Sequence, residues 1–247
     1  MNTKKTIAII GATSSIAEQC ARLWVKQDAT HLILIGRNRE RLEVVAKDLL
    51  VRNPLVNVEI REANFLDPEA IAQTVEELFI GGPIDIALIA HGSLPEQSEC
   101  QENLVLCKEM LEVNGISPVL YAEAFARHMS NLNQGTIAII GSVAGDRGRK
   151  SNYVYGAAKG LINRYAQGLQ HRFANSKVQI TLIKPGPTAT PMTAKMKGSF
   201  ASAEEVANTI TRGINQKKSV IYAPGKWWLV MMVIRHLPSF IFNKLNI

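Results

Sequence analysis

The strongest constraint on the fold of this chain is the regular alternation of short, apolar, β-branched runs with longer stretches of helical periodicity. The short runs cover residues 6–10, 32–35, 56–60, 84–89, 136–140, 179–183 and 220–222, and the helical stretches cover about 14–27, 39–51, 68–79, 103–130, 153–175 and 202–214. Because the runs are too apolar for strands with one wet face, they predict a parallel sheet that helices cover on both faces. We therefore expect an α/β fold with a doubly wound parallel sheet of about seven strands.

The length and composition of the chain fit one globular domain. Its 247 residues can bury a large core, and 47% apolar with 20% charged residues argues against extended disorder. The net charge of +7 fits solubility, an anionic membrane surface or a phosphorylated ligand. The basic residues form no long run and no stripe interleaved with aromatic residues, so we do not expect nucleic acid as a partner. Cys20, Cys100 and Cys107 lack the spacing of a disulfide framework or a metal site, which predicts a reducing, cytoplasmic setting and no bound metal.

The first predicted strand runs directly into a turn of small residues. Gly11 lets the backbone approach a pyrophosphate closely, and the N-terminus of the helix that follows favours negative charge. The candidate phosphate-binding residues are Gly11, Thr13, Ser14, Ser15 and Ile16. Only one of the three glycines usual in such a motif is present, so an ordinary strand-to-helix turn is the alternative.

The end of the second predicted strand favours NADP(H) over NAD(H) as the cofactor. An acidic residue here would bind the ribose 2′-hydroxyl of NAD, and none is present. The sequence instead reads Gly36-Arg37-Asn38, in which the glycine leaves room and the planar guanidinium of Arg37 can pair with a 2′-phosphate. Asn38 is a further candidate contact, and Arg39 or Arg41 could help. The alternative is that Arg37 is an ordinary surface charge at the start of a helix.

A tyrosine and a lysine four residues apart are the strongest candidates for chemistry. Tyr155 and Lys159 lie on one face of a predicted helix, where the ammonium group is expected to lower the pKa of the phenol from about 10 towards neutral pH. Such a phenol can donate and accept a proton. Ser142, at the end of the preceding predicted strand, can hold a carbonyl oxygen. Tyr153 is the weaker candidate, because Ala157 stands four residues after it.

Asn114 is a candidate for a proton relay. It lies inside a long helical pattern, where an amide side chain can bend the helix and hold a water that relays protons to Lys159. The alternative, an ordinary polar residue of a helix, is the more frequent situation for a single asparagine of this kind.

These motifs together resemble the short-chain dehydrogenase/reductase family over about residues 5–225. The resemblance implies a Rossmann-like fold in one domain of residues 1–225, a nicotinamide cofactor, and a homo-oligomer that is a dimer or tetramer. The catalytic tetrad of the family falls on Asn114, Ser142, Tyr155 and Lys159, of which Tyr155 and Lys159 also contact the cofactor. Further cofactor contacts fall on Asn64, Phe65, Ala90, His91, Gly92, Pro185, Gly186, Thr188 and Thr190. Two of these segments depart from the family pattern, since Ala90-His91-Gly92 stands where Asn-Asn-Ala-Gly is usual, and Asn64-Phe65 where Asp-Val is usual.

Two segments resemble one branch of this family more closely. Residues 142–156 and 231–244 are similar to the reductase components of decaprenylphosphoryl-ribose 2′-epimerases. That resemblance implies an NADPH-dependent oxidoreductase that reduces a keto-sugar, lipid-linked or otherwise activated, which a partner oxidase would supply. A 3-oxoacyl or general ketone/alcohol reductase of the same family is the first alternative. A non-catalytic nucleotide-binding regulator is the second, and its tetrad would be expected to be broken.

The last residues, 226–247, predict an apolar and basic tail packed on the domain or on lipid. Residues 227–234 are uniformly apolar, are flanked by Lys226 and Arg235, and are too few to span a bilayer. Aromatic and basic residues suit a bilayer interface or an isoprenoid-phosphate ligand, which would make the protein peripheral to the inner face of the membrane. The alternatives are a seam between subunits or a cap on the core. Residues 191–201 stand where the family has its substrate lid, and Lys195, Met196 and Lys197 lie at its centre.

Overall fold

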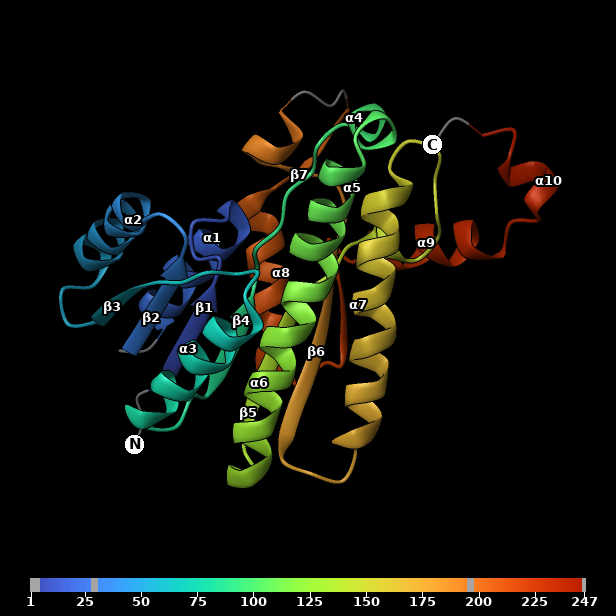
Figure 1. Cartoon of the computed structure of the whole chain (residues 1–247). Helices are drawn as coiled ribbons and strands as arrows, with labels where there is room; N and C mark the ends of the chain where they lie inside the picture. Colours follow the sequence, from blue (N-terminus) through green and yellow to red (C-terminus); the bar gives the residue numbers. More distant parts are fainter. Residues whose placement is uncertain (1–4, 28–30, 195–197, 246–247) are drawn as a thin grey trace.

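The computed structural model, which describes residues 5–27, 31–194 and 198–245, is built on a seven-stranded parallel sheet (Figure 1). The strands are β1 (Thr6–Ile10), β2 (His31–Gly36), β3 (Asn57–Glu62), β4 (Ile86–Ile89), β5 (Gly135–Ile140), β6 (Val178–Pro185) and β9 (Val220–Ala223). All seven predicted strands are confirmed, with ends that differ from the prediction by at most two residues. The chain therefore has the expected single-domain, Rossmann-like α/β fold.

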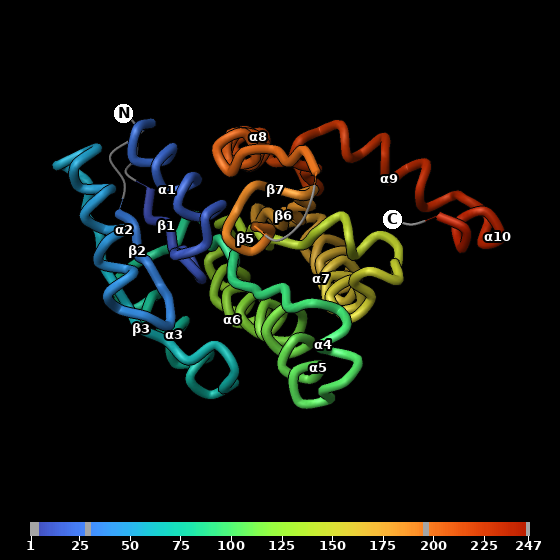
Figure 2. The backbone as a smooth tube through the Cα atoms, turned by 90° about the horizontal axis from the view of Figure 1, so that it is seen from above, coloured from blue at the N-terminus to red at the C-terminus, as the bar shows by residue number. Residues whose placement is uncertain are grey.

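Helices cover both faces of this sheet, as the apolar strands require (Figure 2). Ile7 and Ile9 of β1 point to a core formed with α1 (Ser15–Gln27), α2 (Arg39–Arg52) and α8 (Ala203–Asn215). Ala8 and Ile10 point to the opposite core, formed with α3 (Pro68–Ile80), α6 (Ser117–Leu132) and α7 (Tyr153–Arg172). Because successive side chains of a strand point to opposite faces, one short strand contributes apolar side chains to both cores.

The reversal of strand order at β1 determines where a ligand can bind. From β1 the chain adds β2 and β3 on one side, and then returns to place β4, β5, β6 and β9 on the other. Between the carboxyl ends of β1 and β4 the two halves of the chain diverge, and doubly wound sheets bind ligands at this point. The same edge of the sheet carries the loops that follow β5 and β6.

The predicted helix over 103–130 is divided into separate segments. They are α5 (Leu104–Leu111), a π-helical turn (Glu112–Ile116) and α6, with α4 (Gln97–Glu102) before them. α5 begins where it does because the Asn103 side chain accepts hydrogen bonds from the N–H groups of Val105 and Leu106, at 3.0 and 3.1 Å. The bend expected at Asn114 is the π turn, in which the Ser117 N–H reaches back to the Glu112 carbonyl.

A small second sheet that the sequence did not predict lies beyond the end of β6. It pairs β7 (Thr188–Ala189) with β8 (Ala201–Ser202), and each strand is too short to show a periodicity in the sequence. The pairing brings together the two ends of the segment that was expected to form a substrate lid. The central lid residues, Lys195, Met196 and Lys197, lie outside the described residues.

The C-terminal tail forms two helices, α9 (Lys226–His236) and α10 (Ser239–Phe242), which extend away from the sheet (Figures 1 and 2). Met231 is fully buried, which fixes one side of α9 on the domain. The large apolar side chains that remain exposed in the tail are Trp228, Leu229, Val230, Met232, Val233, Phe240, Ile241 and Leu245. Within the three described stretches of the chain, no helix has both the length and the hydropathy needed to cross a membrane.

Candidate active site

The turn after β1 packs closely on the loop after β4, at a position that requires glycine. Gly11 has a φ of +81°, and a Cβ added to it would lie 2.6 Å from the backbone nitrogen of His91. The N–H groups of Gly11 and Ala12 donate to the Ile35 carbonyl at 2.8 and 3.1 Å, which fixes the turn against β2. α1 begins at Ser15, so its first N–H groups face the carboxyl edge of the sheet. All the predicted phosphate-binding residues lie in this turn or the first turn of α1: Gly11, Thr13, Ser14, Ser15 and Ile16.

Arg37 and Asn38 follow β2, and they differ in what their side chains are free to bind. Arg37 is exposed and lies close enough to His91 for its charge to lower the pKa of that imidazole. The side-chain oxygen of Asn38 accepts a hydrogen bond from the Arg41 N–H at 2.8 Å and caps α2. Arg39 pairs with Glu43 at 3.2 Å. Of the two side chains, that of Arg37 is therefore open to a ligand, whereas that of Asn38 caps the helix.

Asn64 and Phe65 follow β3, and their side chains differ in exposure. Asn64 is exposed, and its side-chain oxygen accepts a hydrogen bond from the Leu66 N–H at 2.9 Å. Phe65 is 4% exposed, and its ring centroid lies 4.6 Å from that of His91 and 5.7 Å from that of Tyr121. The Phe65 ring is therefore part of the core, so this residue could meet an adenine only through its backbone.

His91 follows β4 and is buried beside Phe65. Its Nε2 lies 2.8 Å from the Ser117 hydroxyl oxygen, and its Nδ1 has no hydrogen-bond partner among the described residues. Burial is the main reason that the pKa of His91 falls to about 3, and the charges of Lys159 and Arg37 lower it further. The imidazole is therefore neutral at physiological pH.

Ser142, Tyr155 and Lys159 converge at the carboxyl end of β5. The Ser142 hydroxyl oxygen accepts a hydrogen bond from the Ala144 N–H at 3.1 Å, and Ser142 lies close enough to Tyr155 to lower the pKa of its phenol. The Lys159 Nζ lies 5.7 Å from the centroid of the Tyr155 ring and donates to the Ile140 carbonyl at 3.0 Å. Tyr153, the weaker candidate, is 45% exposed.

The pKa values of this cluster correct one expectation. Burial raises the pKa of Tyr155 to about 12, and the nearby Ser142 only partly opposes it. The predicted lowering by Lys159 is wrong for this structure, because the ammonium group points to the Ile140 carbonyl and the cost of burying a phenolate is larger. Burial also lowers the pKa of Lys159, to about 8. Tyr155 is thus a neutral phenol at pH 7, and Lys159 is largely a cation.

Asn114 is fully buried in the π turn, which packs on α7 through Gly115 and Ala158. Its Oδ1 accepts a hydrogen bond from the Ser93 N–H at 3.0 Å, and its Nδ2 donates to the Met110 carbonyl at 3.0 Å. A Cβ on Gly92 would lie 2.7 Å from Asn114 Oδ1 and 3.9 Å from Lys159 Nζ. Gly92 therefore lets the β4 loop, the π turn and α7 meet, and the amide of Asn114 holds that junction.

The end of β6 brings a residue of the tail into the site. Pro185 ends β6, and a Cβ on Gly186 would lie 1.9 Å from the indole nitrogen of Trp227. The Thr188 hydroxyl donates to the Gly186 carbonyl at 2.9 Å, and Thr190 precedes the short 3₁₀ turn that follows β7. Trp227 therefore covers the segment that was expected to hold the nicotinamide end of the cofactor. The sequence marked the tail as a neighbour of the site but gave no sign that Trp227 would pair with Gly186.

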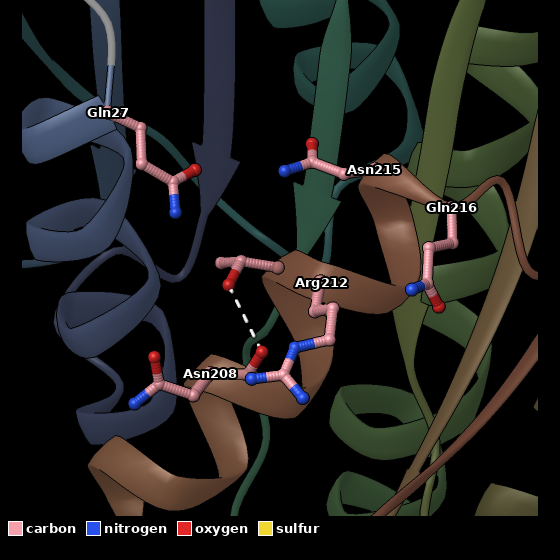
Figure 3. A pocket seen from close by; sticks show the side chains of 6 residues that line it. Gln27, Asn208, Arg212, Asn215 and Gln216 are labelled. Atoms are coloured by element: carbon pink, nitrogen blue, oxygen red, sulfur yellow. Dashed lines mark hydrogen bonds between the residues drawn. The ribbon is translucent and has the colours of Figure 1, made fainter.

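Two surface pockets lie away from these residues. One, of about 330 Å³, is lined by Gln27 at the end of α1 and, in and just after α8, by Asn208, Thr211, Arg212, Asn215 and Gln216 (Figure 3). Because both helices end there and lead into β2 and β9, this pocket lies at the amino edge of the sheet. The other, of about 260 Å³, lies between α1 and α2 and includes Glu18 and Arg41. Neither contains a residue of the tetrad.

Comparison with known sequences identifies the family. The sequence profile described as short chain dehydrogenase matches residues 5–199, so the chain belongs to this family and is an oxidoreductase that works with a nucleotide cofactor. An uncharacterized oxidoreductase of Streptomyces coelicolor is 25% identical over 244 residues, which cover 98% of this chain and 96% of the relative. An uncharacterized oxidoreductase of Mycobacterium tuberculosis is 28% identical over 242 residues, which cover 97% of this chain and 96% of the relative.

Solved structures share the fold along nearly the whole chain. A short-chain dehydrogenase from Sphingobium yanoikuyae in complex with NADPH has a TM-score of 0.83 at 21% identity, with 98% of this chain and 96% of that one covered. A short chain dehydrogenase from Burkholderia cenocepacia in complex with NADP has a TM-score of 0.84 at 16% identity, with 99% and 98% covered. At these identities the likeness establishes the fold.

The buried imidazole of His91 predicts acid sensitivity. The unfolded chain takes up a proton on this residue below its ordinary pKa near 6.5, whereas the folded protein does so only near 3, so His91 stabilises the fold fully above 6.5 and loses that contribution as the pH falls towards 3. As the pH falls from 6.5 to 5, the free energy of unfolding of the wild type should fall more steeply than that of His91→Asn, by a difference that approaches about 1.4 kcal/mol per pH unit. Urea unfolding curves at several pH values measure this difference. The exposed His171, changed to Asn, is the control and should keep the wild-type slope. Equal slopes for wild type and His91→Asn would contradict the assignment.

Proposed function

We propose that this protein reduces a carbonyl group to an alcohol with NADPH, through Ser142, Tyr155, Lys159 and Asn114. The observation that carries the proposal is the convergence of Ser142, Tyr155 and the buried Lys159 at the sheet edge where the Gly11 turn also lies. A non-catalytic nucleotide-binding regulator would have no need of this buried convergence. We therefore retain catalysis as the function.

The residues can share the work of reduction as follows. A bound nicotinamide supplies a hydride to the carbonyl carbon. Tyr155 donates its proton to the carbonyl oxygen, and its raised pKa keeps the phenol protonated at neutral pH, which suits a proton donor. Ser142 holds and orients the same oxygen. Lys159, as a buried cation, stabilises the phenolate that is left.

Asn114 contributes to this scheme through the proton supply. Its Nδ2 already donates to the carbonyl and the sulfur of Met110, and its Oδ1 accepts from Ser93, so a relay water would donate to the remaining acceptor position of Oδ1. The proton that Tyr155 gives up would then return through this water and Lys159. The amide thus fixes the π turn and faces the relay at the same time.

The preference for NADP(H) over NAD(H) rests on the end of β2. Arg37 is exposed there, no acidic residue stands at the end of the strand, and the Asn38 side chain is used as a helix cap. The backbone around Gly11 would hold the pyrophosphate, and Gly186 with Thr188 would lie at the nicotinamide end. Two proteins of the same fold carry NADPH or NADP in their solved structures, which agrees with this choice.

For the substrate we propose a keto-sugar that is lipid-linked or otherwise activated, supplied by a partner oxidase. The support is the likeness of residues 142–156 and 231–244 to the reductase branch described above. A ketone or 3-oxoacyl reductase is the second candidate, since a solved protein of this fold from Comamonas testosteroni is a ketone-specific alcohol dehydrogenase. A panel of keto-sugars, ketones and 3-oxoacyl thioesters with NADPH would separate these substrate classes. We also expect a homo-oligomer.

We further propose that the tail, residues 226–247, meets an anionic lipid surface. α9 exposes Trp228, Leu229 and Val233, with exposed fractions of 57, 56 and 55%. Lys226 and Arg235 lie at its two ends, and the tail contains no acidic residue. In a symmetric contact between two copies these like charges would face each other without partners, whereas anionic headgroups would neutralise them. A lipid-linked substrate would then be presented beside Trp227.

Changing Tyr155 to Phe tests the acid. The variant keeps the ring but cannot donate a proton, so turnover should fall by about 100- to 10,000-fold while NADPH affinity changes little. Steady-state reduction of the best substrate of the panel and titration of NADPH fluorescence measure the two quantities. Tyr153→Phe, at an exposed neighbour, should keep wild-type turnover. Turnover that survives Tyr155→Phe would remove the mechanism.

Changing Arg37 to Ala tests the choice of cofactor. Loss of a charge-assisted contact to the 2′-phosphate should weaken NADPH binding by about 10- to 100-fold and leave NADH binding unchanged. Calorimetric titration with both cofactors gives the two dissociation constants. Arg39→Ala is the matched control, because Arg39 already pairs with Glu43. An equal loss of affinity for both cofactors would show that Arg37 does not recognise the 2′-phosphate.

Two charge substitutions on the exposed face of α9, Trp228→Glu with Val233→Glu, test the tail. They are preferable to deletion, because removing the tail would also remove the buried Met231. The wild type should co-sediment with vesicles that contain phosphatidylglycerol but not with pure phosphatidylcholine, and the variant with neither. Its kcat/KM should fall on a lipid-linked substrate more than on a soluble analogue. Leu55→Glu, at a residue 84% exposed elsewhere, is the control. Loss of self-association in place of vesicle binding would assign the face to a second copy.

A further inference from the structure

We propose that Asp146 is a positioning residue that holds Ser142 at its working distance from Tyr155 and Lys159. This inference rests on the proposed function. Asp146 follows the 3₁₀ turn Val143–Gly145, which itself follows Ser142, and its side chain is 3% exposed. Its carboxylate receives three hydrogen bonds, from Lys184 Nζ at 2.5 Å, Asn163 Nδ2 at 3.1 Å and Tyr222 OH at 2.8 Å.

The three donors come from three different elements of the fold. Asn163 lies in α7, one helical turn after Lys159, while Lys184 lies in β6 and Tyr222 in β9. The carboxylate therefore ties the loop after β5 to the catalytic helix and to the last two strands of the sheet. A buried ion pair contributes little to stability unless further hydrogen bonds satisfy its remaining donor and acceptor positions, as they do here. Such an arrangement fixes the relative positions of the elements that it joins.

The turn before Asp146 rests directly on the backbone of α7. A Cβ on Gly145 would lie 2.6 Å from the carbonyl carbon and oxygen of Lys159, and a Cβ on Gly156 would lie 3.0 Å from the Ala144 carbonyl oxygen. The Ala144 N–H also donates to the Ser142 hydroxyl oxygen. Any shift of Asp146 therefore moves the turn on α7 and displaces the Ser142 hydroxyl from Tyr155.

The amide of Asn163 shows that this geometry is kept at a cost. Its Nδ2 donates to Asp146, but its Oδ1 is buried without a hydrogen-bond partner among the described residues. A buried acceptor without a partner destabilises the fold. A network selected for stability alone would not keep this unpartnered oxygen. A network that must hold α7 against Asp146 can tolerate it.

Neutralising the pair tests the inference. Asp146→Asn with Lys184→Met removes both buried charges at once, so that neither is left without its partner. Asp48→Asn is the matched control, because Asp48 also accepts three hydrogen bonds, from Arg22 and Arg52, but lies on α2. Each variant is measured for Tm, NADPH affinity, kcat, the isotope effect with 4-deuterated NADPH, and hydrogen exchange of residues 142–146.

We expect the double variant to lose at least tenfold in kcat with NADPH affinity unchanged. Its isotope effect should rise as hydride transfer becomes slower than the other steps, and exchange at 142–146 should increase. Asp48→Asn should lower Tm with wild-type kcat and isotope effect, and Lys184→Arg should restore most of the activity relative to Lys184→Met. A double variant with wild-type kcat, isotope effect and exchange would overturn the positioning role, even where Tyr155→Phe abolishes turnover. Exchange that increases in a protein without reductase activity would instead count against the proposed function alone.

Discussion

Backbone contact between the turn after β5 and helix α7 is the constraint on which the candidate site depends. Gly145 and Gly156 carry no side chain at the points where the two segments touch, so the turn lies directly on the helix. The Ser142 hydroxyl, the Tyr155 phenol and the Lys159 ammonium group belong to these two segments. Their relative positions are therefore set by main-chain packing, which is stiffer than any contact between long side chains.

The fold was largely predictable because its signals are local. Each strand is a short apolar run, and each helix that covers the sheet has its own periodicity, so the parallel order followed from connection rules. The same holds for Tyr155 and Lys159, which are neighbours along one helix. The small sheet of β7 and β8 was not predictable, since two residues carry no period. The contacts of Asp146 with Lys184 and Tyr222 join residues 38 and 76 positions apart, and no local pattern encodes them.

The sign of the tyrosine pKa shift shows where reasoning from the sequence fails. Spacing places an ammonium group one turn from the phenol, and from this alone the phenol should become more acidic. The structure adds burial, which acts on both groups in the direction of neutrality, and it aims the ammonium group at the Ile140 carbonyl. Burial of His91 acts in the same way. Desolvation depends on the whole fold and cannot be read from spacing. Here its effect on the pKa of Tyr155 is larger than the pairwise effect of Lys159 that the sequence predicts.

The loop from Ser142 to Asn152 joins the site to the tail. Arg147 follows Asp146, and its guanidinium donates to the carbonyls of Ile234 and Leu237 at the end of α9, at 2.6 Å each. It also lies 3.7 Å from the centroid of the Phe242 ring. Consecutive residues of one loop thus bind inward to α7 and outward to the tail. Because this segment is held from both sides, a displacement of α9 would act directly on the loop that carries Ser142. The Arg147 contacts thus couple the position of the tail to the loop that carries Ser142.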